Sequence, residues 1–346
     1  MIDSSIGLVE SHLHSLLMSP GSLSSVKRAA RLLPRCAVNF FGFECRLGEE
    51  EGATDCALSL TAEGARLLSG RHPEPVAPEL RSDAWLRVQR FYQEWGDTRQ
   101  PAYGDAGATW LEFDSGSEPV KPNLLFGYWP HDPVVRRPKP WLLEVILPLL
   151  LGTPISERFR ANLLRCFDAC PPGANDFQIG AMIARGIQAV RLCVFDIRPE
   201  DIPAFLTRVG WKGELEAVRR HLEAFAPHAD FVGLHLDVGE KLFPQIGIEP
   251  GFRAGPWARQ PHLEPRWHRQ FEKLVDLGLC TPAKRDALLS WSGYQHCPED
   301  GQEEKSVLLR GLSHLKINLR AGAPPLAKAY FGIAHRSPHA EANTAA

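Results

Sequence analysis

Polar and aliphatic residues alternate along two neighbouring segments in the last tenth of the chain. Between Leu312 and Arg320 every second residue is polar, and after a stretch containing Gly322, Pro324 and Pro325 the alternation resumes. The polar residues of the two segments are His314, Lys316, Asn318, Arg320, Lys328 and Tyr330. Residues two apart in a β-strand lie on the same face, so the two segments predict a hairpin with one apolar and one cationic face. Taken alone, such a face suits either bulk water or a polar ligand.

The same combination of helices followed by a hairpin recurs along the chain. Alternating apolar and polar residues predict hairpins in five places, and apolar residues at helical spacing predict helices before each of them. The predicted hairpins are 39–47 with 55–61, 109–114 with 123–129, 176–184 with 189–197, 230–239 with 243–249, and 312–320 with 326–333. The predicted helices are two between 6 and 35, then 79–95, 141–151, 156–169, 199–209, 213–226, 265–278 and 282–291, with loops at 62–78, 250–263 and 293–306. We therefore expect an α+β fold with ten antiparallel strands.

Ten strands in one sheet curl, and closing the sheet into a barrel removes both unpaired edges. The helices then cover the apolar face, which turns the polar face inward. The residues predicted to face the interior are Glu44, Arg46, Asp55, Ser59, Glu112, Asp114, Gln178, Arg191, Cys193, His235, Asp237, Gln245, Glu249, His314, Lys316, Asn318, Arg320, Lys328 and Tyr330. Burying so many charges without partners is unfavourable, so the interior must hold water or a polar ligand.

This arrangement resembles the αββα (ABBA) prenyltransferase barrel, the fold of enzymes that prenylate indoles, phenols and cyclic peptides. The resemblance covers about residues 6–335 as one domain and concerns topology. It implies that prenyl diphosphate is the co-substrate and that strand-borne Lys, Arg and Tyr hold its diphosphate. The matching positions are Lys316, Asn318 and Arg320, with Lys328 and Tyr330, and further Arg46 and Arg191. The resemblance also implies an acid that accepts the proton of the aromatic ring, for which Glu112 and Glu44 are the candidates.

A second hypothesis retains the barrel without prenyl transfer. The predicted interior has six carboxylates against five Arg and Lys side chains, a mixture that suits a peptide, and Trp110 and Trp129 could form apolar walls. A hydrolytic variant would need a metal ion. Its candidate ligands are His235, Asp237, Glu249 and His314, of which the first two share one strand face.

Composition excludes several other classes of protein. The 346 residues have a formal net charge of −2, which gives no overall basic field for nucleic acid or an anionic membrane. The longest apolar run, 141–151, is too short to span a bilayer. The eight cysteines form no CxxC motif, so we expect neither disulfides nor a structural zinc. We expect a cytoplasmic protein with no certain cofactor and a disordered tail at 336–346, whereas the oligomeric state and the aromatic or peptide partner stay open.

Overall fold

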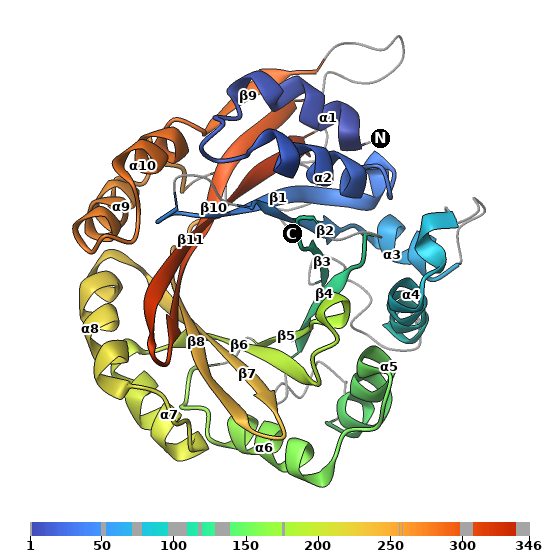
Figure 1. Ribbon diagram of the computed structural model, residues 1–346, viewed down its shortest axis with the longest axis vertical. Helices are drawn as coiled ribbons and strands as arrows, with labels where there is room; N and C mark the ends of the chain where they lie inside the picture. Colours follow the sequence, from blue (N-terminus) through green and yellow to red (C-terminus); the bar gives the residue numbers. More distant parts are fainter. Residues whose placement is uncertain are drawn as a thin grey trace.

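Ten antiparallel strands close into a barrel in the computed structural model, as the sequence predicts (Figure 1). The structure describes residues 2–49, 53–70, 78–95, 109–116, 120–128, 139–174, 177–255, 257, 259–297 and 307–336. Each strand pairs with the next along the chain from β1 to β8, then β8 pairs with β10 and β10 with β11. The barrel closes where β11 pairs with β1, with Ile333 opposite Phe41.

The strands agree with the predicted hairpins to within a few residues, except at the last one. They are β1 Val38–Arg46, β2 Asp55–Leu60, β3 Thr109–Phe113, β4 Asn123–Tyr128, β5 Phe177–Ala181, β6 Ala189–Ile197, β7 Phe231–Gly239, β8 Leu242–Gly251, β9 Gly293–His296, β10 Val307–Arg320 and β11 Ala323–Arg336. The last hairpin is longer than predicted because β10 begins before Leu312, and Pro324 and Pro325 belong to β11. Of the predicted tail 336–346, residues 337–346 lie outside the described residues.

The helices form a ring around the barrel (Figure 1). They are α1 Ile2–Val9, α2 Pro20–Ala30, α3 Ala62–Leu68, α4 Asp83–Trp95, α5 Leu147–Leu151, α6 Glu157–Asp168, α7 Ile202–Val209, α8 Leu215–Phe225, α9 Arg266–Asp276 and α10 Pro282–Leu289. The side chains of Ser19, Thr61, Ser156 and Thr281 cap the N-termini of α2, α3, α6 and α10 by accepting backbone N–H groups. Helix α5 ends at Gly152, which adopts the left-handed conformation at low cost because glycine has no Cβ.

Three segments differ from the prediction. Helix α3 lies in a stretch predicted as loop, where the Thr61 cap outweighs the low helix propensity of Gly64. Strand β9 lies in the predicted loop 293–306 and extends the sheet beside the first part of β10. The predicted helix 141–151 begins as a π-helix over Trp141–Ile146, which precedes a proline at 148 that cannot donate a backbone hydrogen bond.

The apolar core lies between the barrel and the helices. Large side chains such as Phe41, Phe126 and Phe331 project from the outer face of the strands toward the helices and are at most 2% exposed. They pack against helix side chains such as Phe91 of α4, whose ring lies 5.0 Å from that of Phe126. Because each buried side chain of this size stabilises the fold by about 1.5–3 kcal/mol, the outer face is fixed and the polar face of the strands must point inward. Among the described helices none has the length and apolar character needed to cross a membrane.

Candidate functional site

A row of three cations crosses three adjacent strands. Arg46 of β1 lies opposite Lys328 of β11, and Lys328 lies opposite Lys316 of β10. Like charges on directly opposed residues destabilise a sheet. Anionic groups inside the barrel must therefore offset the repulsion within this cationic row, and the carboxylates of Glu44 and Glu49 do so for Lys328 and Arg46.

A second row lies one step along the same inner face. Glu44 of β1 is opposite both Asp55 of β2 and Tyr330 of β11, and Tyr330 is opposite His314 of β10. Two carboxylates and two aromatic rings thus lie beside the three cations. The β10 register shifts between Leu312 and His314, but the predicted inward positions of His314 and Lys316 are retained.

The interior of the barrel consists of two adjoining cavities. The first, which we call the aromatic chamber, has a volume of about 560 Å³, and its lining includes Phe40, Trp110, Phe195, Phe231, Phe252, Asp55, Glu249 and His314. The second, the cationic chamber, has a volume of about 300 Å³, and its lining includes Arg46, Asp237, Gln245, Asn318, Arg320 and Lys328. Seven residues line both chambers: Glu44, Glu112, Arg185, Arg191, His235, Lys316 and Tyr330.

Charge is unevenly distributed between the two chambers. Six Arg and Lys side chains and four carboxylates line the cationic chamber, whereas four Arg and Lys side chains and six carboxylates line the aromatic chamber. The near balance predicted for the whole interior therefore separates into a basic end and an acidic end. A dianion would be attracted to the basic end.

Glu44 is held by the cationic row. Its carboxylate forms an ion pair with Lys328, and the Tyr330 hydroxyl donates to it. Burial raises the pKa of Glu44, but the Lys328 ammonium outweighs burial and brings the pKa to about 2. Glu44 is therefore ionised at neutral pH and is a poor proton acceptor.

Glu112 of β3 lies where the two chambers meet. Among the described residues no side chain forms a hydrogen bond or ion pair with its carboxylate. Burial and the neighbouring charge of Glu44 raise the pKa of Glu112. Of the two predicted bases, Glu112 thus has the free carboxylate and the greater proton affinity.

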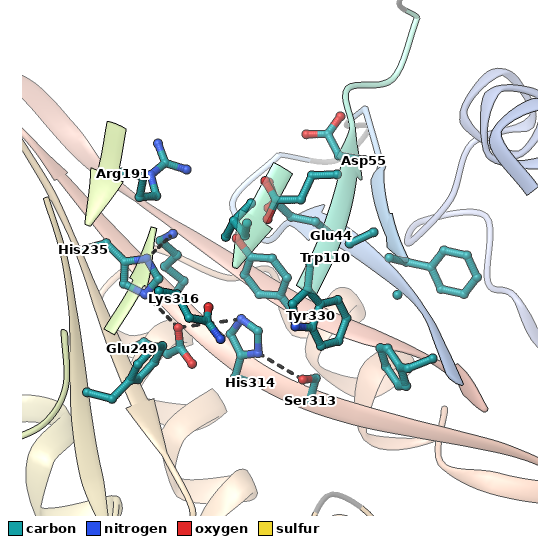
Figure 2. Close-up of a pocket in the computed structure, with 18 of the residues that line it drawn as sticks. Glu44, Asp55, Trp110, Arg191, His235, Glu249, Ser313, His314, Lys316 and Tyr330 are labelled. Atoms are coloured by element: carbon teal, nitrogen blue, oxygen red, sulfur yellow. Dashed lines mark hydrogen bonds and ion pairs between the residues drawn. The ribbon is translucent and has the colours of Figure 1, made fainter. Parts of the chain in front are cut away.

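Lys316 begins a chain of buried polar groups (Figure 2). Its Nζ lies 3.0 Å from Nδ1 of His235, and Nε2 of His235 lies 2.8 Å from Oε2 of Glu249. Because an ammonium donates to Nδ1, the ring carries its proton on Nε2 and donates it to Glu249. Burial and the charge of Lys316 hold the pKa of His235 well below its usual value, while burial raises the pKa of Glu249 to about 7.

The proposed metal ligands do not form a metal site in the part of the chain that the structure describes. Nε2 of His314 lies 3.8 Å from Glu249, but Asp237 is bound by Arg191 at 3.0 Å and by Gln245 at 2.6 Å. Among the described side chains, no group of three or more His, Cys, Asp and Glu is arranged to hold a metal ion. The interpretation of Asp237 as a ligand is therefore replaced by an ion pair, whose carboxylate also raises the pKa of Arg191 against the effect of burial.

His314 and Tyr330 form a stacked pair. Their ring centres are 4.0 Å apart and their planes differ by 17° (Figure 2). Burial and the charge of Lys316 lower the pKa of His314 to about 3, so the imidazole is neutral. The pair presents neutral π-systems to the aromatic chamber.

The remaining predicted binding residues line the outer part of the cationic chamber. Arg46 lies 3.5 Å from Glu49, and Asn318 of β10 lies opposite Gly247 of β8. Arg320 is exposed and donates to the carbonyl of Pro324 at 3.3 Å. The structure thus brings all seven predicted binding residues to one cavity, with Lys316, Arg191 and Tyr330 at its boundary with the aromatic chamber.

Sequence reasoning missed most of the aromatic chamber. Phe40 and Phe195 share the strand phase of Glu44 and Arg191, so the alternation contains a signal for them, but the predicted interior does not include either phenylalanine. Asp196 has a φ of 55° and lies where the β6 register shifts, which no sequence pattern revealed. Arg185, which forms an ion pair with Asp114 across the chamber boundary, precedes the turn glycine Gly186 and lies outside any strand. Trp129 lies outside the described residues.

The fold and the paired chambers define the class of structure: the chain folds as an ABBA prenyltransferase barrel. No protein-family model and no curated protein sequence matches it. Among solved structures it is similar to the prenyltransferase PriB in its complex with the product diphosphate, with 12% identity, 96% of both chains covered and a TM-score of 0.53. The PriB ternary complex with L-tryptophan and dimethylallyl thiolodiphosphate gives 10% identity, the same coverage and a TM-score of 0.53. A 5-dimethylallyltryptophan synthase from Streptomyces coelicolor gives 14% identity, coverage of 95% and 97%, and a TM-score of 0.46. Identities this low establish the fold alone.

Proposed function

We propose that this protein transfers a prenyl group from a prenyl diphosphate to an aromatic acceptor. The observation that carries the proposal is the cationic row of Arg46, Lys328 and Lys316, which faces a chamber next to an aromatic one. A diphosphate in the cationic chamber would offset the repulsion within the row. The PriB structures support the proposal because that protein holds a diphosphate and an aromatic amino acid within the same fold.

The chemistry follows from the order of the groups between the chambers. Breaking the bond between C1 of the prenyl group and the diphosphate oxygen leaves negative charge on the diphosphate, which Lys316 and the paired Arg191 would stabilise. The allylic carbon is then attacked by a carbon of the aromatic ring, and a new carbon–carbon bond forms. The ring proton passes to Glu112, whose raised pKa suits a proton acceptor. The neutral His314–Tyr330 stack faces the allylic cation with π-electrons and adds no positive charge.

Lys316 provides the test, since its charge has no carboxylate within ion-pair distance among the described side chains. Replacing it by methionine removes the charge and keeps most of the volume. A charge-assisted contact to phosphate contributes about 1.5–3 kcal/mol, so the variant should bind dimethylallyl diphosphate about 10- to 100-fold more weakly by calorimetry. It should also lose prenylated product, detected by mass spectrometry with indole acceptors.

The matched control is Lys212→Met, at an exposed lysine between α7 and α8. This variant should bind the diphosphate as the unmodified protein does. Equal weakening in both variants, or no binding of dimethylallyl or geranyl diphosphate to the unmodified protein, would refute the proposal.

A second candidate function is peptide binding without prenyl transfer. The observation that favours it is that Arg46, Arg185, Arg191 and Lys328 each have a carboxylate partner within the barrel. These pairs offer both signs of charge to a zwitterionic chain. A tryptophan-containing peptide that raises the melting temperature when no diphosphate does would favour this function.

A further inference from the structure

The β1–β2 side of the aromatic chamber carries a carboxylate, Asp55, that has no cationic partner among the described residues. Glu44 and Asp55 lie directly opposite each other on β1 and β2, and Lys328 neutralises only Glu44. Asp55 accepts the backbone N–H of Ser115 at 2.7 Å, and among the described residues no Arg or Lys forms an ion pair with it. Burial and the charge of Glu44 raise the pKa of Asp55. Among the described residues the fold therefore leaves the Asp55 carboxylate without a cation, next to Glu44 and facing a cavity, which is unfavourable.

The cations of the same chamber are already engaged. Arg185 pairs with Asp114, Arg191 with Asp237 and Arg253 with Asp196, at 2.5, 3.0 and 2.8 Å. Lys316, the fourth cation that lines the chamber, lies at its border with the cationic chamber and binds His235. Among the described residues that line the chamber, every Arg and Lys therefore already has a partner, so a carboxylate on the acceptor would have to compete for one of them.

Aromatic rings stand beside the acidic side. Trp110 of β3 packs edge-on against Phe40 of β1 at 5.9 Å, and Trp257 lies 6.5 Å from Phe40. Figure 2 shows Trp110 below Glu44 and Asp55, on the same side of the chamber. An aromatic ligand can stack on these rings, and an ammonium is attracted both to indole faces and to carboxylates.

We propose that the acceptor is an aromatic amine whose ammonium group binds at Asp55, and that aromatic acids and amino acids are selected against. The proposal rests on the proposed function in one respect, since it treats the aromatic chamber as the acceptor site. The amine supplies the cation that Asp55 lacks, and the ring lies toward Trp110. A zwitterion such as tryptophan would bring a carboxylate that must compete with the diphosphate for Lys316.

Three indole ligands that differ only in the charged groups of their side chains can separate the effect of the ammonium from that of the carboxylate. We would measure the binding of tryptamine, L-tryptophan and indole-3-propionate to the whole protein by calorimetry, without diphosphate. Because a charge-assisted contact in a cavity changes affinity by about tenfold or more, tryptamine should bind at least that much more tightly than either of the others. The proposal would be overturned if tryptamine bound no more tightly than L-tryptophan or indole-3-propionate. It would also be overturned if neither tryptamine nor tyramine bound at millimolar concentration.

Asp55→Asn is the matching variant. Asparagine keeps an oxygen that can accept the N–H of Ser115, so the fold is retained while the charge is removed. The preference for tryptamine should fall to less than about threefold, whereas Asp276→Asn, at an exposed position that ends α9, should leave it unchanged. A preference that survives in Asp55→Asn would exclude Asp55 as the amine site.

The failure of this inference differs from the failure of the proposed function. Diphosphate binding and prenylation of L-tryptophan as efficiently as of tryptamine would refute amine selection and leave prenyl transfer intact. Tight amine binding that depends on Asp55, without any diphosphate binding, would keep the amine site and refute prenyl transfer.

Discussion

Replacing Glu249 by glutamine should make the protein more stable at pH 8 and should change its stability little at pH 5. The carboxyl group has a pKa of about 7 in the folded protein, raised by burial from an ordinary value of 4.5. As pH rises from 4.5 to 7, the unfolded chain releases this proton while the folded chain retains it, so folding becomes less favourable with rising pH. Integrated between pH 5 and pH 8, this difference amounts to about 2–3 kcal/mol. Glutamine cannot ionise, but its carbonyl oxygen can still accept the Nε2–H of His235.

The assay is urea unfolding followed by tryptophan fluorescence at pH 5, 6, 7 and 8. The quantity to compare is the difference in free energy of unfolding between the variant and the unmodified protein at each pH, which cancels the titration of all other groups. It should move by about 2–3 kcal/mol in favour of the variant as pH rises. Glu223→Gln, at an exposed position on α8, should show no such trend. A difference that stays constant from pH 5 to pH 8 would refute the reasoning that Glu249 is buried and protonated in the acidic range.

Two further substitutions test the cationic row. Lys328→Met leaves the partly buried Glu44 carboxylate without its cation and should lower the free energy of unfolding, by about 3 kcal/mol if the cavity excludes water there. The double variant Lys328→Met with Glu44→Gln should recover most of this loss in urea unfolding, and no recovery would contradict the pairing. In Gly247→Ala the new Cβ would lie 2.6 Å from Cε of Lys316, which is flexible enough to move aside. We expect the free energy of unfolding to change by less than about 1 kcal/mol while the affinity for diphosphate falls about fivefold or more in calorimetry. The control is Gly7→Ala on α1, where no atom lies within 4 Å of the new Cβ. Unchanged affinity in Gly247→Ala would show that Lys316 does not bind the diphosphate.

The strand alternation was sufficient to predict the barrel because its outer face is fixed by large apolar side chains. Once Phe41 and Phe331 must point toward helices, Glu44 and Tyr330 can only point inward. The same reasoning failed for Phe40, since an apolar residue on the inner face cannot be distinguished by type from one in the core. Alternation alone therefore does not predict the aromatic chamber.

The pairing within the site could not be predicted from alternation. Strand phase shows which residues face inward, but not which strands become neighbours around the barrel. The alternation predicts only that Asp237 and His235 share a strand face, which made both candidate metal ligands, whereas the register places Arg191 opposite Asp237 and the two form an ion pair. Residues outside strands, such as Arg185, had no periodic signal at all.

The pairing of β1 with β11 has a consequence for how the protein is made. The barrel is closed by β1 and β11, the first and the last of the described strands along the chain. During synthesis β11 therefore leaves the ribosome only after the other described strands have done so. Until then a growing chain has an open sheet with unpaired edges, which favours association with other chains. Sheets that depend on partners so distant in sequence assemble slowly, and molecular chaperones that shield exposed strands would act in that interval.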